Sequence, residues 1–314
     1  MKVTIFGVGA MGSVYAARFA ETGADVVAID PWQAHMQAIR ANGLRLDGPD
    51  GERIVTGIQA GDDPSIAQGS DLIVIATKAA GVEDAARAIR PLITPETTVL
   101  TIQNGLGAED RIARHLPRGN TLLGVADGFG ASMQGPGHVR HTAMKLIRLG
   151  ELEGGLTPRL ERMAGVWQTA GFQARAFADI HQLIWEKLLC NVTLSAPCTV
   201  HDCTVGDLLS NSDHWAEALE AMREAYACGQ ASGIAFSFDD PEAYVTQFAE
   251  MVRNASPSMR LDHVALRPSE IDFINGAIPP IGRAFGIATP VNDRLSETVR
   301  AREANFGGHR HENR

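Results

Sequence analysis

The motif Gly7-Val8-Gly9-Ala10-Met11-Gly12 lies directly between two runs of different periodicity. Lys2 to Phe6 is rich in residues that favour strands, and Ser13 to Glu21 has the apolar spacing of a helix. Asp25 to Ile29 is an apolar run again. A strand, a glycine-rich turn, a helix and a second strand form a βαβ unit. A G-x-G-x-x-G turn in this context predicts a binding site for the pyrophosphate of a dinucleotide.

Each glycine of the motif has a physical role in such a turn. Gly7 permits the tight turn, Gly9 lets the backbone approach the pyrophosphate, and Gly12 lets the helix pack closely on the strand. The helix N-terminus then presents N–H groups and partial positive charge to the phosphates. We therefore interpret all six residues of the motif as cofactor-binding; a glycine-rich turn without a ligand is the alternative.

The choice of dinucleotide depends on the end of the second strand, where Asp30 stands. A carboxylate at this point accepts hydrogen bonds from the ribose hydroxyls of the adenosine and repels a 2′-phosphate. Asp30 therefore favours NAD(H). Arg40, in the region expected to form the next helix, is the nearest candidate for binding a 2′-phosphate, so NADP(H) stays open.

The alternation of strands and helices continues through the first half of the chain and predicts a parallel sheet covered on both faces. The expected strands are Asp71 to Ala76, Thr98 to Ile102 and Leu122 to Ala126, and the expected helices are Val82 to Ile89 and Glu109 to His115. After these, His138 to Leu149 alternates like antiparallel strands, Pro158 to Ala170 is helical, and Phe172 to Phe177 is a strand. We expect these segments to complete the same sheet.

From about Ile180 the pattern is almost entirely helical. The long candidates are His181 to Leu194, His214 to Ala231, Pro241 to Asn254 and Glu270 to Phe285. The predicted fold is therefore α/β, with an N-terminal Rossmann-type doubly wound sheet in residues 1–178 and a C-terminal all-helical domain in residues 179–314.

The composition and charge of the chain limit the classes of partner that it is expected to bind. With 45% hydrophobic and 21% charged residues the chain has the composition of a globular protein, and its net charge of −9 opposes binding to nucleic acid or to an anionic membrane surface. A small-molecule ligand is the better expectation. No apolar run is long enough to span a membrane, and the N-terminus lacks the basic segment of a signal peptide, so we expect a cytoplasmic protein.

We expect no metal site. Four cysteines fall in one region and are expected to be thiols in such a chain, and the spacing of Cys198, His201 and Cys203 matches no standard zinc pattern. The histidines near the C-terminus, in Phe306 to Arg314, are interpreted as part of a frayed tail rather than as metal ligands.

Polar residues stand at two further kinds of position. Lys78 and Asn104 each follow the carboxyl end of an expected parallel strand, where such sheets bind ligands, although Asn104 also suits an Asn-Gly turn. Lys187, Asn191 and Ser195 follow one another at helical spacing in an apolar helix. Such a polar stripe lines a cleft or contacts solvent.

The motifs taken together resemble the ketopantoate reductase family, the 2-dehydropantoate 2-reductases, over nearly the whole chain. The matching segments, in order, are Gly7-Val8-Gly9-Ala10-Met11-Gly12, Thr77-Lys78, Gln103-Asn104-Gly105-Leu106-Gly107, Trp185-Glu186-Lys187-Leu188-Leu189-Cys190-Asn191 and Ser269-Glu270-Ile271-Asp272-Phe273-Ile274-Asn275-Gly276. The resemblance implies a Rossmann domain, a helical domain, and reduction of a 2-keto acid by hydride from a nicotinamide.

The resemblance also implies a role for each site residue. Lys187 matches the general acid, and Glu270 matches the carboxylate that anchors the substrate hydroxyl and the lysine. The other matches are Asn191 and Ser258 as substrate-holding residues, Asn104 near nicotinamide and substrate, and Lys78 on the cofactor side. Caps of helix N-termini are the alternative for Glu270 and Ser258.

Two departures from the family pattern bear on substrate and cofactor. Ser195, which we also place at the substrate, stands where the biosynthetic enzymes commonly carry a second asparagine, and Asp30 stands where NADP-binding members carry a basic residue. The leading hypothesis is reduction of ketopantoate to pantoate, in pantothenate biosynthesis. The alternatives are an NAD-linked dehydrogenase of another 2-hydroxy acid and a cofactor-sensing protein without catalysis. A homodimer is a further expectation, from the apolar surface of the helical domain.

Overall fold

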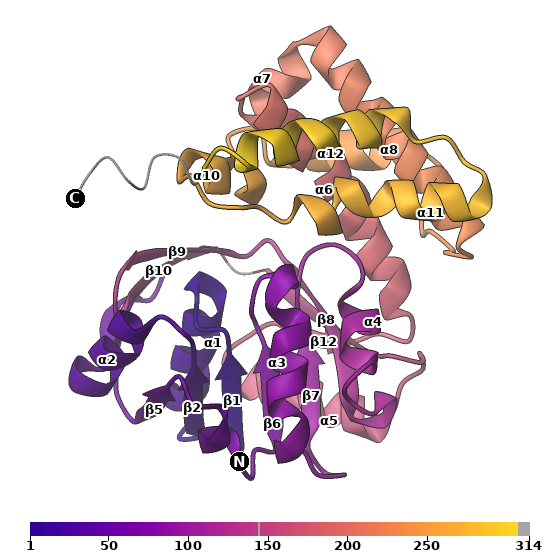
Figure 1. The fold of residues 1–314 in the computed structure, drawn as a ribbon. Helices are drawn as coiled ribbons and strands as arrows, with labels where there is room; N and C mark the ends of the chain where they lie inside the picture. Colours follow the sequence, from indigo (N-terminus) through magenta and orange to yellow (C-terminus); the bar gives the residue numbers. More distant parts are fainter. Residues whose placement is uncertain (144, 307–314) are drawn as a thin grey trace. The chain divides into compact units, whose positions relative to one another are not determined.

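The computed structural model describes residues 1–143 and 145–306, which form two compact units (Figure 1). Unit 1 comprises residues 1–103 and 108–180, and unit 2 comprises residues 104–107 and the chain from residue 181 onward. The short segment 104–107 is therefore part of the second unit although it follows a strand of the first.

Unit 1 is built on an eight-stranded sheet with the order β12-β11-β8-β7-β6-β1-β2-β5. The strands are β1 (Lys2–Phe6), β2 (Asp25–Ile29), β5 (Ile58–Gly61), β6 (Leu72–Ile75), β7 (Thr98–Thr101), β8 (Thr121–Asp127), β11 (Leu146–Glu151) and β12 (Ala174–Ala176). All pairs are parallel except β8 with β11. The order reverses between β1 and β6, and in doubly wound sheets this reversal opens the ligand crevice at the carboxyl ends of the strands.

Helices cover both faces of this sheet, as the alternation of buried side chains requires. The helices of unit 1 are α1 (Ala10–Glu21), α2 (Gln33–Asn42), α3 (Val82–Ile89), α4 (Ala108–Ala113) and α5 (Pro158–Thr169), with short 3-10 turns η1 (Pro64–Ala67), η2 (Ala79–Gly81), η3 (Arg90–Leu92) and η4 (Arg118–Asn120). On β6, Leu72 and Val74 join the apolar cluster that includes α1 and α5. Ile73 and Ile75 join the cluster that includes α3 and α4. A strand buried on both faces reads as a continuous apolar run, which explains its sequence.

A second, four-stranded sheet corrects part of the sequence-based prediction. It has the order β4-β3-β10-β9 and consists of β3 (Leu44–Gly48), β4 (Gly51–Val55), β9 (Gly130–Gly135) and β10 (His138–Ala143). We expected the antiparallel segment 138–149 to complete the first sheet, and only its second half does so, as β11. The first half pairs instead in parallel with β3, a strand that the sequence pattern did not reveal.

Unit 2 is helical throughout the part that the structure describes, which confirms the predicted fold class. Its helices are α6 (Ile180–Val200), α7 (Val205–Ser210), α8 (Ser212–Ala231), α9 (Pro241–Met251), α10 (Ser258–Val264), α11 (Ile278–Phe285) and α12 (Pro290–Glu303). None of the helices in the described ranges is both long and apolar enough to cross a membrane.

One expected helix, Glu270 to Phe285, is wrong over its first half. The chain there forms two 3-10 turns, η5 (Ile271–Phe273) and η6 (Asn275–Ala277), and α11 begins only at Ile278. Pro279 stands in the first turn of α11. Proline has no N–H group and is best accommodated in the first turn of a helix, so Pro279 favours a helix that begins at this point.

A buried polar network fixes the segment that holds these 3-10 turns. The Asn275 side-chain amide donates to the Val192 carbonyl of α6 at 3.0 Å and to the Asn292 side chain of α12 at 3.0 Å. The carboxylate of Glu224, on α8, accepts hydrogen bonds from the backbone N–H groups of Val291 and Asn292 at 2.8 and 2.9 Å. Asn275 is therefore held by α6 and α12, and α12 is held in turn by Glu224 of α8.

Candidate functional site

Two of the three motif glycines are required by packing alone. Gly7 has a φ of +94°, and a Cβ atom there would lie 2.5 Å from the backbone nitrogen of Thr77. A Cβ atom on Gly12 would lie 2.0 Å from the carbonyl oxygen of Gly7. A side chain on Gly12 would push α1 away from β1, and a side chain on Gly7 would push the turn away from the residues that follow β6.

Gly9 is different, because a Cβ atom there would meet nothing within 4 Å. It is the N-cap residue of α1, no side chain caps the N-terminus of that helix, and no acidic residue stands in its first turn. The first N–H groups of α1, which carry the positive end of the helix dipole, therefore have no capping side chain as acceptor, and the space beside Gly9 is open. These are the conditions under which a phosphate group fits a helix N-terminus.

Asp30 lies directly against this turn. Its Oδ2 atom accepts a hydrogen bond from the Val8 N–H at 2.7 Å, and its Oδ1 atom accepts one from the Trp32 N–H at 2.9 Å. A carboxylate offers about four acceptor positions, so capacity remains for ribose hydroxyls. Arg40, the candidate for a 2′-phosphate, donates instead to the Ala60 carbonyl on β5 at 3.0 Å.

The neighbouring strand ends are tied together by Gln103. Its side-chain amide donates to the carbonyls of Ile75 and Thr77 at 2.7 and 3.1 Å, and so joins the carboxyl end of β7 to that of β6. Lys78 follows as an exposed residue at the start of η2. The Thr77-Lys78 segment therefore stands at the same sheet edge as the glycine turn, since Thr77 is the residue that Gly7 approaches.

In unit 2 the structure brings Asn104 and Glu270 together. The Asn104 side-chain amide donates to Glu270 Oε2 in a long hydrogen bond of 3.4 Å. Two positions later the Leu106 N–H donates to the Phe273 carbonyl at 2.8 Å. Gly105 between them has a φ of +81°, and a Cβ atom there would lie 2.1 Å from the Phe273 carbonyl oxygen. Segment 104–107 thus packs in direct backbone contact with residues 270–273.

The polar stripe on α6 is present as expected from the spacing. Lys187 and Asn191 are half-buried, and Ser195 is buried. Glu186, a residue that the sequence-based assignment left without a role, is also buried and accepts hydrogen bonds from the Gln182 side chain at 3.0 Å and the Ser237 N–H at 2.8 Å. The Glu186 carboxylate therefore binds the loop before α9. Of the neighbours Glu186 and Lys187, the lysine is the one that belongs to the polar stripe.

Ser258 is an exposed residue at the beginning of α10. The N-cap residue of α10 is Pro257 rather than Ser258, and Glu270, the N-cap residue of η5, makes no side-chain capping hydrogen bond. A helix N-terminal charge at Glu270 and a cap from Ser258 stay predictions.

The residues considered as metal ligands have other partners. His201 Nε2 lies 2.6 Å from Glu217 Oε2, and none of the four cysteines, all of which lie in the described residues, forms a disulfide. Among residues 1–143 and 145–306, no three potential ligands of the His, Cys, Asp or Glu type lie close enough to hold a metal ion. The C-terminal histidines at positions 309 and 311 lie outside the described residues.

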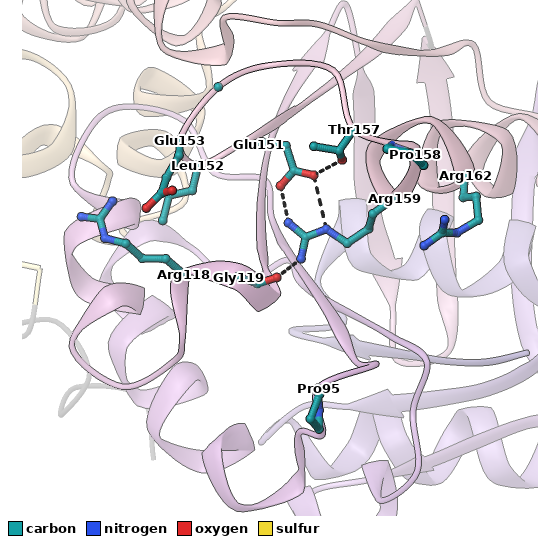
Figure 2. Close-up of a pocket in the computed structure, with 11 residues that line it drawn as sticks. Pro95, Arg118, Gly119, Glu151, Leu152, Glu153, Thr157, Pro158, Arg159 and Arg162 are labelled. Carbon is teal, nitrogen blue, oxygen red and sulfur yellow. Dashed lines mark hydrogen bonds and ion pairs between the residues drawn. The ribbon is translucent and has the colours of Figure 1, made fainter.

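A cavity of about 510 Å³ in unit 1 has none of the glycine-turn residues in its lining, and Figure 2 shows its lining residues. It is bordered by the residues that precede β7 and β8, and thus lies at the amino ends of the parallel strands. Its most buried charge, Glu151, pairs with Arg159 and accepts from the Thr157 hydroxyl. Because these groups satisfy one another and the glycine turn is at the opposite sheet edge, we do not place the cofactor in this cavity.

Two family models match the two parts of the chain. The family described as "Ketopantoate reductase PanE/ApbA" matches residues 3–154, and its C-terminal family, "Ketopantoate reductase PanE/ApbA C terminal", matches residues 179–303. A 2-dehydropantoate 2-reductase of Streptococcus pyogenes is 32% identical over 305 residues, which are 97% of this chain and 98% of that protein.

Solved structures are similar over the same extent. A PanE/ApbA family ketopantoate reductase from Ralstonia eutropha has a TM-score of 0.88 at 30% identity, covering 98% of this chain and 100% of the other. D-mandelate dehydrogenase in a ternary structure with NADH and anilino(oxo)acetate has a TM-score of 0.90 at 29% identity, with the same coverage. Both halves of the chain match in sequence and in fold, and the chain therefore belongs to the ketopantoate reductase family.

Proposed function

We propose that this chain reduces a 2-keto acid to a 2-hydroxy acid with a nicotinamide dinucleotide, and that ketopantoate is the substrate. The observation that carries the proposal is the contact of Asn104 with Glu270, at 3.4 Å, in the helical unit. The resemblance assigns both residues to the substrate, and they are 166 positions apart in the sequence. Membership of the family and the activity named for the Streptococcus pyogenes relative support the same function.

The roles of the residues follow from the chemistry of the reduction. When bound, the nicotinamide supplies a hydride to the keto carbon, which leaves negative charge on the oxygen. Lys187 acts as the general acid that gives this oxygen its proton, and the half-buried position of its side chain limits competition from water. Glu270 accepts a hydrogen bond from the substrate hydroxyl and orients the ammonium group. Asn104, Asn191, Ser195 and Ser258 bind the remaining polar groups of the substrate.

The glycine motif, Lys78 and Asp30 hold the cofactor in this proposal. Open space at Gly9 supports a pyrophosphate position, and the exposed Lys78 supplies positive charge at the neighbouring strand end. NAD(H) is the preferred form, because the Asp30 carboxylate stands at the turn and the Arg40 guanidinium is engaged with Ala60. The expected kcat/KM is higher with NADH than with NADPH by tenfold or more. An equal or higher value with NADPH would remove Asp30 as the determinant of the cofactor.

The catalytic proposal is tested with Lys187→Ala and the exposed control Lys145→Ala. Ketopantoate-dependent NADH oxidation should fall at least 100-fold in Lys187→Ala, a size typical of removing a general acid. The dissociation constant for NADH should stay within about twofold in both variants, and Lys145→Ala should keep full turnover. Unchanged turnover in Lys187→Ala would exclude its role, and tight NADH binding by the wild type without turnover of any keto acid would favour a cofactor-sensing protein.

A second candidate function is NAD-linked oxidation of another 2-hydroxy acid. Two observations favour it, namely the carboxylate of Asp30 at the turn and Ser195 in place of an asparagine on the α6 stripe. The similarity to D-mandelate dehydrogenase bound to NADH adds to them. A panel of branched and aromatic 2-keto acids, with the matching 2-hydroxy acids in the reverse direction, separates the two functions. A kcat/KM for ketopantoate well above all the others would exclude this second candidate.

Assembly and location belong to the proposal as well. The apolar residues Leu261, Val264 and Leu266, in and after α10, are exposed and support a homodimer through the helical unit. Sedimentation velocity at micromolar concentration tests this, and a monomer at all concentrations would exclude it. A cytoplasmic location stays a prediction of the sequence.

A further inference from the structure

An exposed tryptophan stands beside the proposed cofactor turn and has no role in the function described so far. Trp32 follows Asp30-Pro31 at the carboxyl end of β2, and 39% of it is exposed. Its backbone N–H donates to Asp30 Oδ1 at 2.9 Å, so the backbone that carries the indole is fixed relative to the carboxylate. An exposed indole beside a ligand-binding carboxylate offers an aromatic face at a defined place.

One side of this indole is already supported by a buried ring. The imidazole of His35 stacks on Trp32 with a centroid distance of 5.0 Å and an interplanar angle of 21°. His35 is fully buried, and its Nδ1 atom accepts a hydrogen bond from the Gly137 N–H at 2.8 Å. A backbone N–H can only donate, so Nδ1 is the acceptor of this bond. Burial also lowers the pKa of His35, which favours the neutral ring.

The support continues from His35 to the glycine turn. His35 Nε2 lies 3.2 Å from the Ser13 hydroxyl, which donates in turn to the Val8 carbonyl at 3.2 Å. The Val8 N–H donates to Asp30. The turn, the carboxylate and the ring beneath the indole therefore form one connected hydrogen-bonded unit. The Trp32 ring is thus stacked on a ring that belongs to this unit, and 39% of the residue stays exposed.

We infer that the exposed indole of Trp32 is the platform on which the adenine of the dinucleotide stacks. The inference rests on the proposed NAD(H) site. In a doubly wound sheet the two halves of a dinucleotide lie on opposite sides of the reversal in strand order, here between β1 and β6. The ribose that binds Asp30 places its base next to the residues that follow Asp30. Of these, Trp32 is the one that offers a π-surface, and stacking on an aromatic side chain is a strong interaction for every base.

Isothermal titration calorimetry tests the inference. The ligands are AMP, ADP-ribose and nicotinamide mononucleotide, and the proteins are the wild type, Trp32→Ala, Trp32→Phe and the neighbouring control Gln33→Ala. Trp32→Ala should weaken AMP and ADP-ribose on the order of 5- to 100-fold, and leave nicotinamide mononucleotide within about twofold. Trp32→Phe should recover most of the affinity, and Gln33→Ala should bind like the wild type. Near-ultraviolet circular dichroism of each variant checks the fold.

Fluorescence gives a second readout that a merely structural role of Trp32 would not move. The chain has four tryptophans, and AMP should quench the emission of the wild type but not that of Trp32→Phe. Unchanged AMP affinity in Trp32→Ala, or equal weakening of AMP and nicotinamide mononucleotide, would overturn the stacking inference while the NAD(H) site stands. A wild type that binds no ADP-ribose would overturn the cofactor proposal and this inference together.

Discussion

Replacing Gly105 with alanine tests whether the docking of segment 104–107 on residues 270–273 matters for activity. The residue has a φ of +81°, which costs an alanine about 1–2 kcal/mol. The new Cβ atom would lie 2.1 Å from the Phe273 carbonyl oxygen, so the two backbones must separate. Separation breaks the 2.8 Å bond from the Leu106 N–H to that carbonyl, a loss of about 1 kcal/mol. The expected destabilisation of folding is therefore about 2–3 kcal/mol.

The effect on catalysis should be larger than the effect on stability. Asn104 adjoins Gly105 and donates to Glu270 at 3.4 Å, so a shift of the backbone breaks this already long bond. Misplacing a substrate-binding group by about 1 Å lowers rates on the order of 100-fold. We expect kcat/KM for the keto acid to fall by this factor at a temperature where circular dichroism shows that the variant is folded.

The chain offers a matched control in Gly23, at the end of α1. Its φ is +80°, but a Cβ atom there would meet nothing within 4 Å. Gly23→Ala should therefore cost only the strain of about 1–2 kcal/mol and leave kcat/KM unchanged. Urea unfolding and steady-state kinetics of both variants give the comparison. If Gly105→Ala is as active as Gly23→Ala, the docking of segment 104–107 is not needed for the reaction.

Three further predictions concern other parts of the chain. Gly9→Ala should fold with wild-type stability, because its Cβ meets nothing within 4 Å, and should weaken NADH at least tenfold by calorimetry; unchanged affinity would move the pyrophosphate elsewhere. Glu224→Ala leaves two buried N–H groups of α12 without acceptors, and urea unfolding should show a loss of about 3 kcal/mol or more. Burial opposes ionisation of Glu217, but hydrogen bonds from Arg294 and His201 bring its pKa below the ordinary 4.5. Its contribution to stability is thus present above pH 4.5 and lost as the pH falls through the folded pKa. The difference in free energy of unfolding between wild type and Glu217→Gln should therefore be constant near neutral pH and shrink in acid. A difference that grows in acid would contradict this prediction.

Local patterns in the sequence predict the central sheet well because its strands are short, apolar and buried on both faces. The predicted bounds of β1, β2 and α3 are those of the structure. The β3–β4 hairpin was missed because the alternation in β3 is short, with only Leu44 and Leu46 buried, and β4 has a single buried residue, Val55. Segment 270–277 was predicted as helix because its apolar spacing is helical, whereas contacts of Asn275 with two other helices impose 3-10 turns.

The candidate site shows the same division between local and tertiary information. Spacing alone places Lys187, Asn191 and Ser195 on one face of a helix, since that depends only on the period of the helix. The contact of Asn104 with Glu270 joins positions 166 residues apart and depends on the packing of the whole helical unit. Trp32 gave no signal in the sequence, because a single exposed aromatic residue has no periodicity and gains its meaning only from the ring beneath it.

The glycine motif itself separates into residues for the fold and a residue for the ligand. Gly7 and Gly12 are required by packing within the protein, because a Cβ atom on either would lie 2.5 Å or 2.0 Å from a backbone atom, and both would be required even if nothing bound there. A protein that lost its cofactor could therefore keep both. Gly9 has no packing reason to lack a side chain, and a missing Cβ at this position is what the close approach of a phosphate group to the backbone requires. Of the three motif glycines, Gly9 is therefore the one whose replacement tests the dinucleotide site separately from the fold.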